Sequence, residues 1–202
     1  MKKLFIILFA FTISSFAMAQ EKTKVKEIGL TFRNLDEFGF SYKVGTEQSL
    51  WRFNALSFSG GTGHQEHSNY DYDSDSDNIG FSFSVGKEYR KLIAKKIEFR
   101  YGADLSFSYR HQKETTDYKS EAVYDEEGKN NYYSPGINMV LGVNYKINDH
   151  IIFGAEIMPH LGYSFSKGTS KNDNGEKTTR ESNSFGYGFS GSSVLLSLAY
   201  RF

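Results

Sequence analysis

The chain has 202 residues, enough for one domain of moderate size, with 24 basic and 24 acidic side chains and a mean hydropathy of −0.51. This charge balance gives no electrostatic reason to expect a nucleic acid partner, and the hydropathy argues against a bundle of membrane-spanning helices. The lack of cysteine excludes a disulfide framework and a lipid anchor on a thiol.

The first 19 residues have the pattern of a secretory signal peptide. Lys2 and Lys3 precede an apolar run over residues 4–16, and Ala17-Met18-Ala19 is a small-x-small cleavage site. The run is too short to span a bilayer, which needs about 20 residues, so a membrane anchor is the weaker alternative. We expect cleavage after Ala19 and a mature domain over 20–202, with a net charge of −2 because the leader carries two lysines and no acid.

Eight segments then alternate apolar and polar residues with the two-residue period of a strand. A helix would mix the two sets of residues on every face, whereas a strand separates them. The apolar positions of these segments, in chain order, fall within 28–32, 38–44, 51–53, 79–85, 97–109, 137–147, 151–165 and 194–202.

The connections between these segments alternate in length. Short ones ("GTEQS", "KEYRKLIAKK" and "ND") alternate with long polar ones at about 61–78, 111–133 and 167–184. Short turns at one end and long loops at the other are typical of outer-membrane barrels. The sequence therefore predicts an all-β fold, an eight-stranded antiparallel up-and-down transmembrane β-barrel, with both termini on the short-turn side.

A soluble eight-stranded barrel with its apolar face inward is the alternative. Its lumen would be just wide enough for packed side chains or one small ligand, and cannot hold so many aromatic rings. We therefore expect the apolar face to contact lipid. Aromatic residues lie near the strand ends, as expected at the two membrane interfaces: Trp51, Tyr89, Tyr145 and Tyr200 at the short-turn ends, and Tyr109, Tyr163 and Phe165 at the long-loop ends.

The opposite face of the same strands carries charged and polar residues that we expect inside the barrel. Buried charges must pair or cost several kcal/mol, so we interpret them as a network that plugs the lumen and sets the strand register. Arg33 and Lys43 are further candidate partners, and a gated narrow pore is the alternative role. The predicted lumen network is Glu98, Arg100, Asp104, Lys146, Glu156 and His160.

Three positions break the regular pattern. Pro159 lies mid-strand, where it cannot donate to the ladder, so we expect a bulge or a local gap there. The apolar parity also changes after Ala55 and again between Phe189 and Val194, which predicts a bulge near Gly191 or aromatic residues that stand above the membrane.

With this architecture and the terminal "LAYRF", residues 20–202 resemble the small OmpA-type and OmpX-type outer-membrane barrels of Gram-negative bacteria. The resemblance implies export to the outer membrane, contact with its lipid and lipopolysaccharide, and recognition of a terminal aromatic strand by the outer-membrane assembly machinery. The residues that would form this assembly signal are Leu198, Tyr200 and Phe202.

The leading functional hypothesis is a structural or surface-interaction role through the long loops. Tyrosines there offer contact surface for an extracellular ligand that the sequence does not identify: Tyr70, Tyr72, Tyr118, Tyr124, Tyr132 and Tyr133. A narrow channel and a lipid A-modifying enzyme are the alternatives.

The sequence gives little support for chemistry. No histidine has serine two residues on, as the deacylase type of barrel enzyme requires, and His64, His67 and Asp71 are the candidates for a palmitoyl-transfer type of site. The acidic loop 71–77 has oxygen ligands suited to calcium but lacks the glycine and the distal glutamate of an EF-hand. We therefore expect no enzyme activity, no cofactor and no metal site.

Overall fold

A computed structural model describes residues 24–33, 37–67, 72–118, 126–172, 174–189 and 194–202. The expected signal peptide, 1–19, lies outside the described residues and stays a prediction. No helix in the described part is long and apolar enough to cross a membrane.

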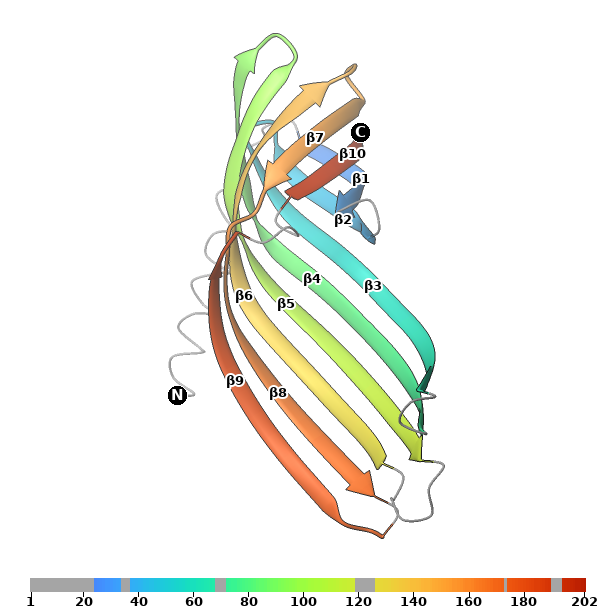
Figure 1. The fold of residues 1–202 in the computed structure, drawn as a ribbon. Helices are drawn as coiled ribbons and strands as arrows, with labels where there is room; N and C mark the ends of the chain where they lie inside the picture. The colour runs from blue at the N-terminus through green and yellow to red at the C-terminus, as the bar shows by residue number, and fades with distance from the viewer. Residues whose placement is uncertain (1–23, 34–36, 68–71, 119–125, 173, 190–193) are drawn as a thin grey trace.

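The described residues form ten β-elements, and Figure 1 shows their arrangement. Two of the predicted strands are each divided into two elements, β7 with β8 and β9 with β10. The elements are β1 (Val25–Arg33), β2 (Glu37–Thr46), β3 (Ser49–His67), β4 (Tyr72–Ala94), β5 (Ile97–Tyr118), β6 (Glu126–Lys146), β7 (Ile151–Ile157), β8 (His160–Asn172), β9 (Lys177–Gly188) and β10 (Val194–Arg201).

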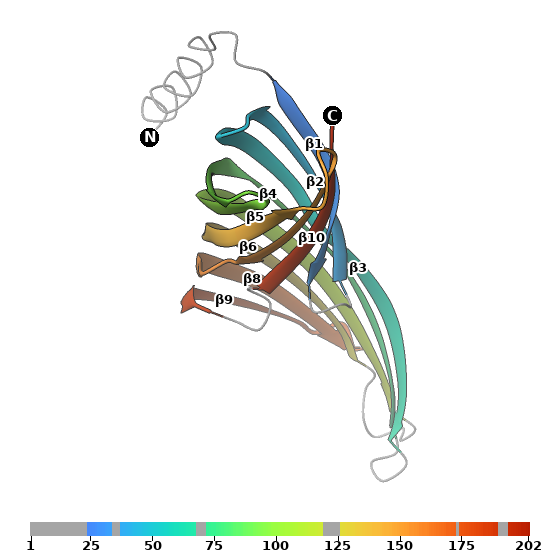
Figure 2. The ribbon, with the colours of Figure 1, turned by 90° about the horizontal axis from the view of Figure 1, so that it is seen from above.

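Eight of these elements form a closed antiparallel ring, which confirms the predicted barrel. Each element pairs with its neighbour in the order β1 to β7, and β10 closes the ring between β7 and β1. At the seam, Lys26 and Phe202 exchange two backbone hydrogen bonds of 3.2 and 2.9 Å. Figure 2 shows β1, β2 and β10 on one side of the barrel and β4 to β6 on the other.

Beyond the ring the strands continue as an open, curved sheet of six elements, β3-β4-β5-β6-β8-β9. In the part of the chain that the structure describes, the far half of β3 and the whole of β9 form no ladder with each other. The cause is strand length, because β1 and β2 have 9 and 10 residues whereas β3 to β6 have 19 to 23. Closure therefore extends only as far as the first hairpin.

Side-chain burial identifies which face of the ring contacts lipid. On β5, Leu105 is 61% exposed whereas the adjacent Asp104 is 1% exposed, and the same alternation runs along the other strands of the ring. Large apolar residues point outward and polar residues point into the lumen. The soluble, inward-apolar barrel is therefore wrong.

Two aromatic girdles bound the apolar surface. At the long-loop end, one row crosses four strands from Phe81 through Tyr109 and Tyr133 to Phe165, with ring centroids 5.5, 5.2 and 6.0 Å apart. At the other end, Tyr89 stacks on Tyr101 at 5.6 Å. On β5 the ten residue-to-residue steps from Phe99 to Tyr109 span roughly 33 Å, which a strand tilt of about 40° converts to an apolar band of about 25 Å.

The irregular positions follow the sequence prediction. Leu56 is an extra residue in β3, since Ala55 pairs with Phe83 and Ser57 with Ser82. Pro159 leaves a gap between β7 and β8, although its carbonyl still accepts a 2.9 Å hydrogen bond from the Met139 amide.

The second parity change reflects a difference in chain length between neighbouring strands. Gly188 pairs with His160 and Val194 pairs with Ile157. Five residues of sequence separate Gly188 from Val194 whereas two separate Ile157 from His160, and the odd difference of three reverses the outward parity from β9 to β10. Residues 190–193, which include the predicted bulge near Gly191, lie outside the described chain.

Substitution of Leu141 by arginine tests the lipid-facing assignment. Leu141 lies on the outward face of β6, so a charge there should destabilise the barrel by about 2–4 kcal/mol in lipid vesicles, as measured by urea unfolding. The adjacent Gly142→Ala variant should destabilise through crowding inside the ring instead, because a Cβ would lie 2.4 Å from the Ala155 carbonyl oxygen. A neutral Leu141→Arg variant would reverse our assignment of the two faces.

Candidate functional site

The lumen of the ring holds charged side chains from all eight of its elements. Each lies at a position of opposite parity to the outward apolar residues, so the alternation of the strand itself aims it inward. They are Glu27, Lys43, Arg52, Glu88, Arg90, Glu98, Arg100, Asp104, Lys146, Glu156 and Arg201.

At the short-turn end, the charges join the seam to β4 across the lumen. Arg90 on β4 donates two hydrogen bonds of 2.7 and 2.8 Å to Glu27 on β1, and Arg201 on β10 donates a third of 2.9 Å to the same carboxylate. Lys146 lies 2.6 Å from Glu98. The two-pronged pairing of Arg90 with Glu27 fixes the relative orientation of the two side chains as well as pairing their charges.

Glu88 is the centre of the network. Its carboxylate is fully buried and accepts hydrogen bonds from Arg90 at 2.6 Å, Lys43 at 2.9 Å and Arg52 at 3.0 Å. One acidic side chain on β4 therefore binds cations from β2 and β3 as well as its own strand.

Arg52 crosses the barrel. It donates hydrogen bonds of 3.1 and 2.8 Å to Glu156, and its Nε lies 3.2 Å from Asp104. β3 and β7, which carry Arg52 and Glu156, lie four places apart in a ring of eight and thus on opposite walls. Arg100 adds a contact of 3.0 Å to Glu156. These contacts join opposite walls of the ring at this level.

Among the described side chains, the network is nearly neutral, with five carboxylates and six cationic groups. Each carboxylate lies within 3.2 Å of at least one cationic nitrogen. Pairing of this density is what burial of so many charges requires, because an unpaired charge in the same place would cost several kcal/mol.

The structure brings together most of the residues predicted for the lumen. Glu98, Arg100, Asp104 and Glu156 are buried inside the ring, and Lys146 lies at its rim. His160 stands apart from them, because its Nδ1 lies 2.9 Å from Asn138 Oδ1 beyond the charged network. The side chain of Arg33 is outside the described part.

Sequence reasoning missed the residues that connect the network. Glu27, Arg52, Glu88, Arg90 and Arg201 were not among the predicted site residues. Arg52, Glu27 and Arg201 share the inward parity of their strands, which is a signal that was available in the sequence. Glu88 and Arg90 lie in a stretch that the sequence suggested as a turn, whereas β4 continues through it to Ala94.

The structure describes only part of the candidate loop sites. Asp73, Asp75 and Asp77 lie on β4, where Asp75 is 2.7 Å from His64 and its carboxylate raises the pKa of that imidazole. No group of three or more acidic or histidine side chains in the described chain is arranged to hold a metal ion. Asp71 and the side chain of His67 lie outside it.

The concave face of the open sheet contains a polar groove of about 480 Å³. Gly128 and Gly168 leave its floor without side chains, and hydroxyl, amide and charged groups surround it. The side chains are those of Glu114, Thr116, Glu126, Asn130, Thr169, Ser170, Thr178 and Arg180.

The outward residues of the last strand, Leu198, Tyr200 and Phe202, lie on the lipid face. Their role as an assembly signal stays a prediction.

Comparison with known proteins gives one family match. Residues 52–202 match the model of the putative OmpA-OmpF-like porin family. No curated protein sequence matches the chain.

Solved structures of similar fold are distant from this chain. The major outer membrane protein of Thermus thermophilus has 14% identity over 89% of this chain and 98% of its own, with a TM-score of 0.45. Ail, the attachment invasion locus protein of Yersinia pestis, has 13% identity over 90% of this chain and 100% of its own, with a TM-score of 0.35.

Replacement of Glu88 by glutamine tests how much the charged network stabilises the folded barrel. Removing this charge leaves buried cations without their common partner, so unfolding in lipid vesicles should require about 3–5 kcal/mol less free energy. Fluorescence of Trp51, the one tryptophan of the chain, reports the transition. Glu127→Gln is the matched control, because Glu127 pairs with Lys113 and Lys129 on the exposed surface and should have little effect. Equal stability of the two variants would contradict a stabilising network.

Proposed function

The chain belongs to the putative OmpA-OmpF-like porin family, and we propose that in this outer-membrane barrel the lumen is a structural plug and the extracellular sheet is the working surface. Membership of a porin family does not by itself require conduction. The proposed role is a non-conducting anchor that presents its long hairpins outside the cell.

The contact between Arg52 and Glu156 carries this proposal. Two hydrogen bonds join side chains from opposite walls of the ring, and Glu88 fills the adjacent space with its three cationic partners. An eight-stranded ring is only wide enough for packed side chains. Opening a path for ions would mean separating several buried pairs at once.

The extracellular sheet offers two distinct faces for interaction. Its concave face holds the polar groove around Gly128 and Gly168, which suits a hydrophilic extracellular ligand. Its convex face carries Lys113, Lys129 and Lys167, just beyond the aromatic girdle at the long-loop end. That height suits the phosphate groups of lipopolysaccharide, a partner that we propose for this face.

Conductance in planar bilayers tests the plug. The wild-type barrel should show no discrete openings, whereas the double variant Arg52→Ala/Glu156→Ala should conduct because both sides of the crossing contact are removed. The control is Lys129→Ala/Glu127→Ala, which removes an ion pair of 2.9 Å from the exterior and should leave the barrel closed. Slower migration of boiled than of unboiled samples on gels would verify that each variant is folded. Regular single-channel openings of the wild type would establish a pore instead.

A further inference from the structure

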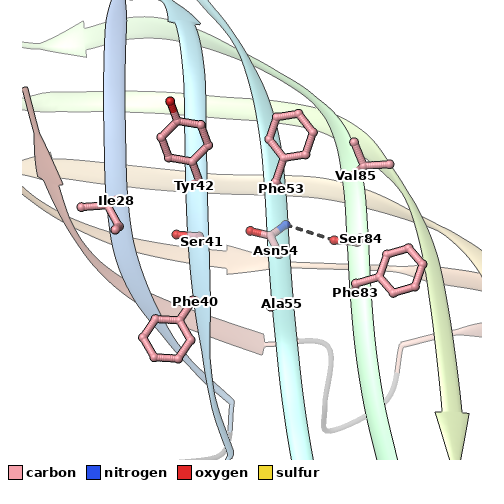
Figure 3. A pocket seen from close by; sticks show the side chains of 10 residues that line it. All are labelled: Ile28, Phe40, Ser41, Tyr42, Phe53, Asn54, Ala55, Phe83, Ser84 and Val85. Atoms are coloured by element: carbon pink, nitrogen blue, oxygen red, sulfur yellow. Dashed lines mark hydrogen bonds between the residues drawn. The ribbon is translucent and has the colours of Figure 1, made fainter.

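Two apolar grooves lie next to each other on the lipid-facing surface over β1. The first has a volume of about 590 Å³ and extends over β1 to β4 (Figure 3), and the second has about 410 Å³ and extends over β2, β1, β10 and β7. Ile28 and Phe40 line both grooves. These two side chains therefore form a ridge between the two hollows.

A small residue accounts for the first hollow. In the first groove Ala55 is the outward residue between Phe40 and Phe83 in one cross-strand row, and its methyl group leaves the space between the two rings open, as Figure 3 shows. In the second groove Gly29 and Ala199 pair with each other at inward positions of their strands, and the outward side chains on either side of them form the walls: Ile28, Leu30, Leu198 and Tyr200. Each groove is thus a gap among large apolar side chains in the hydrocarbon layer.

A positive charge lies at the short-turn end of the ridge. Lys26 is on the same face of β1 as Ile28, two residues closer to that end. Among the described side chains, it is the one charged residue on the outward faces of β1, β2, β7 and β10. Its Nζ lies 5.9 Å from the centre of the Phe202 ring, at the level of the aromatic girdle at the short-turn end.

Polar aromatic groups frame the same place. Tyr200 and Tyr42 pair with Ile28 from the two sides, so that a tyrosine stands on either side of the ridge. In Figure 3 the hydroxyl of Tyr42 points away from Phe40 and Ala55, along the strand. A lysine and two phenols at the level of the lipid head groups are the partners that a phosphate diester prefers.

We propose that this surface binds one anionic diacyl phospholipid of the periplasmic leaflet. Its phosphate lies at Lys26, and its two acyl chains lie in the two grooves on either side of the Ile28–Phe40 ridge. Because the bilayer surrounds this face, the grooves are filled by hydrocarbon, and dispersion contacts favour a chain that fits them. The ammonium group adds the preference for an anionic head group.

Trp51 provides a built-in reporter for the test. It is the one tryptophan of the chain and lies two places from Lys26 in the same cross-strand row, joined through Val44. Bromine atoms near the head-group end of an acyl chain quench indole fluorescence on contact. The full-length barrel is refolded into zwitterionic phosphatidylcholine bilayers that contain a small share of either brominated phosphatidylglycerol or brominated phosphatidylcholine.

The wild type should be quenched more strongly by the brominated anionic lipid. Lys26→Gln should reduce the apparent affinity for that lipid about fivefold. Lys95→Gln, in the exposed turn between β4 and β5, removes the same charge at the same end of the barrel and should keep the wild-type preference. Lys87 is unsuitable as a variant because its Nζ lies 4.8 Å from the Trp51 ring and would change the fluorescence directly.

Ala55→Phe tests the groove separately from the charge. The ring should fill the first groove and weaken quenching by the brominated anionic lipid, while heat-modifiable migration shows that the variant is folded. Equal quenching of the wild type by the two brominated lipids would overturn the proposal, and so would an unchanged preference in Lys26→Gln. Quenching that falls as protein density rises in the bilayer would identify a second copy of the chain as the occupant and would also overturn it.

Discussion

Hydrocarbon offers no hydrogen-bond partner to a peptide group, and this constraint governs the rest of the structure. It requires each strand at membrane depth to be paired on both edges, which the ring achieves by joining β10 to β1. Above the ring this pairing is incomplete. Past the first hairpin, the far half of β3 and the whole of β9 have edges without a ladder in the described residues, and the lower end of β9 pairs with Leu161 and Tyr163, below the Phe165 girdle.

Closing a ring with eight strands produces a narrow lumen, and the strand period fills it with every second side chain. The charged side chains therefore fill the volume of the lumen as well as pairing with one another. Arg52 and Glu156 span the diameter, and Glu88 joins three cations in the adjacent space. A register slip of one residue would move such charges into lipid and large apolar rings into the lumen, so the network also specifies the strand pairing.

Much of this could be predicted from residue parity. The lipid face, the two girdles, the Ala55 bulge and the gap at Pro159 all follow from alternation and from the missing amide of proline. What could not be predicted was the partner of each charge. Glu88 lies in a stretch that appeared to be a turn, and Arg52 meets Glu156 only because the ring places β3 opposite β7. Pairings across 104 residues depend on ring geometry, which a local pattern does not contain.

Thiol labelling tests the central claim that water does not pass through the lumen. Because the chain has no native cysteine, Ser41→Cys places a single thiol at a 4%-exposed position inside the ring, and Ser76→Cys places one on the exposed extracellular sheet. A charged, membrane-impermeant thiol reagent is added to both sides of the bilayer. The account predicts rapid labelling of Ser76→Cys and none of Ser41→Cys until the barrel is unfolded. Equally fast labelling of both variants in the folded barrel would contradict it.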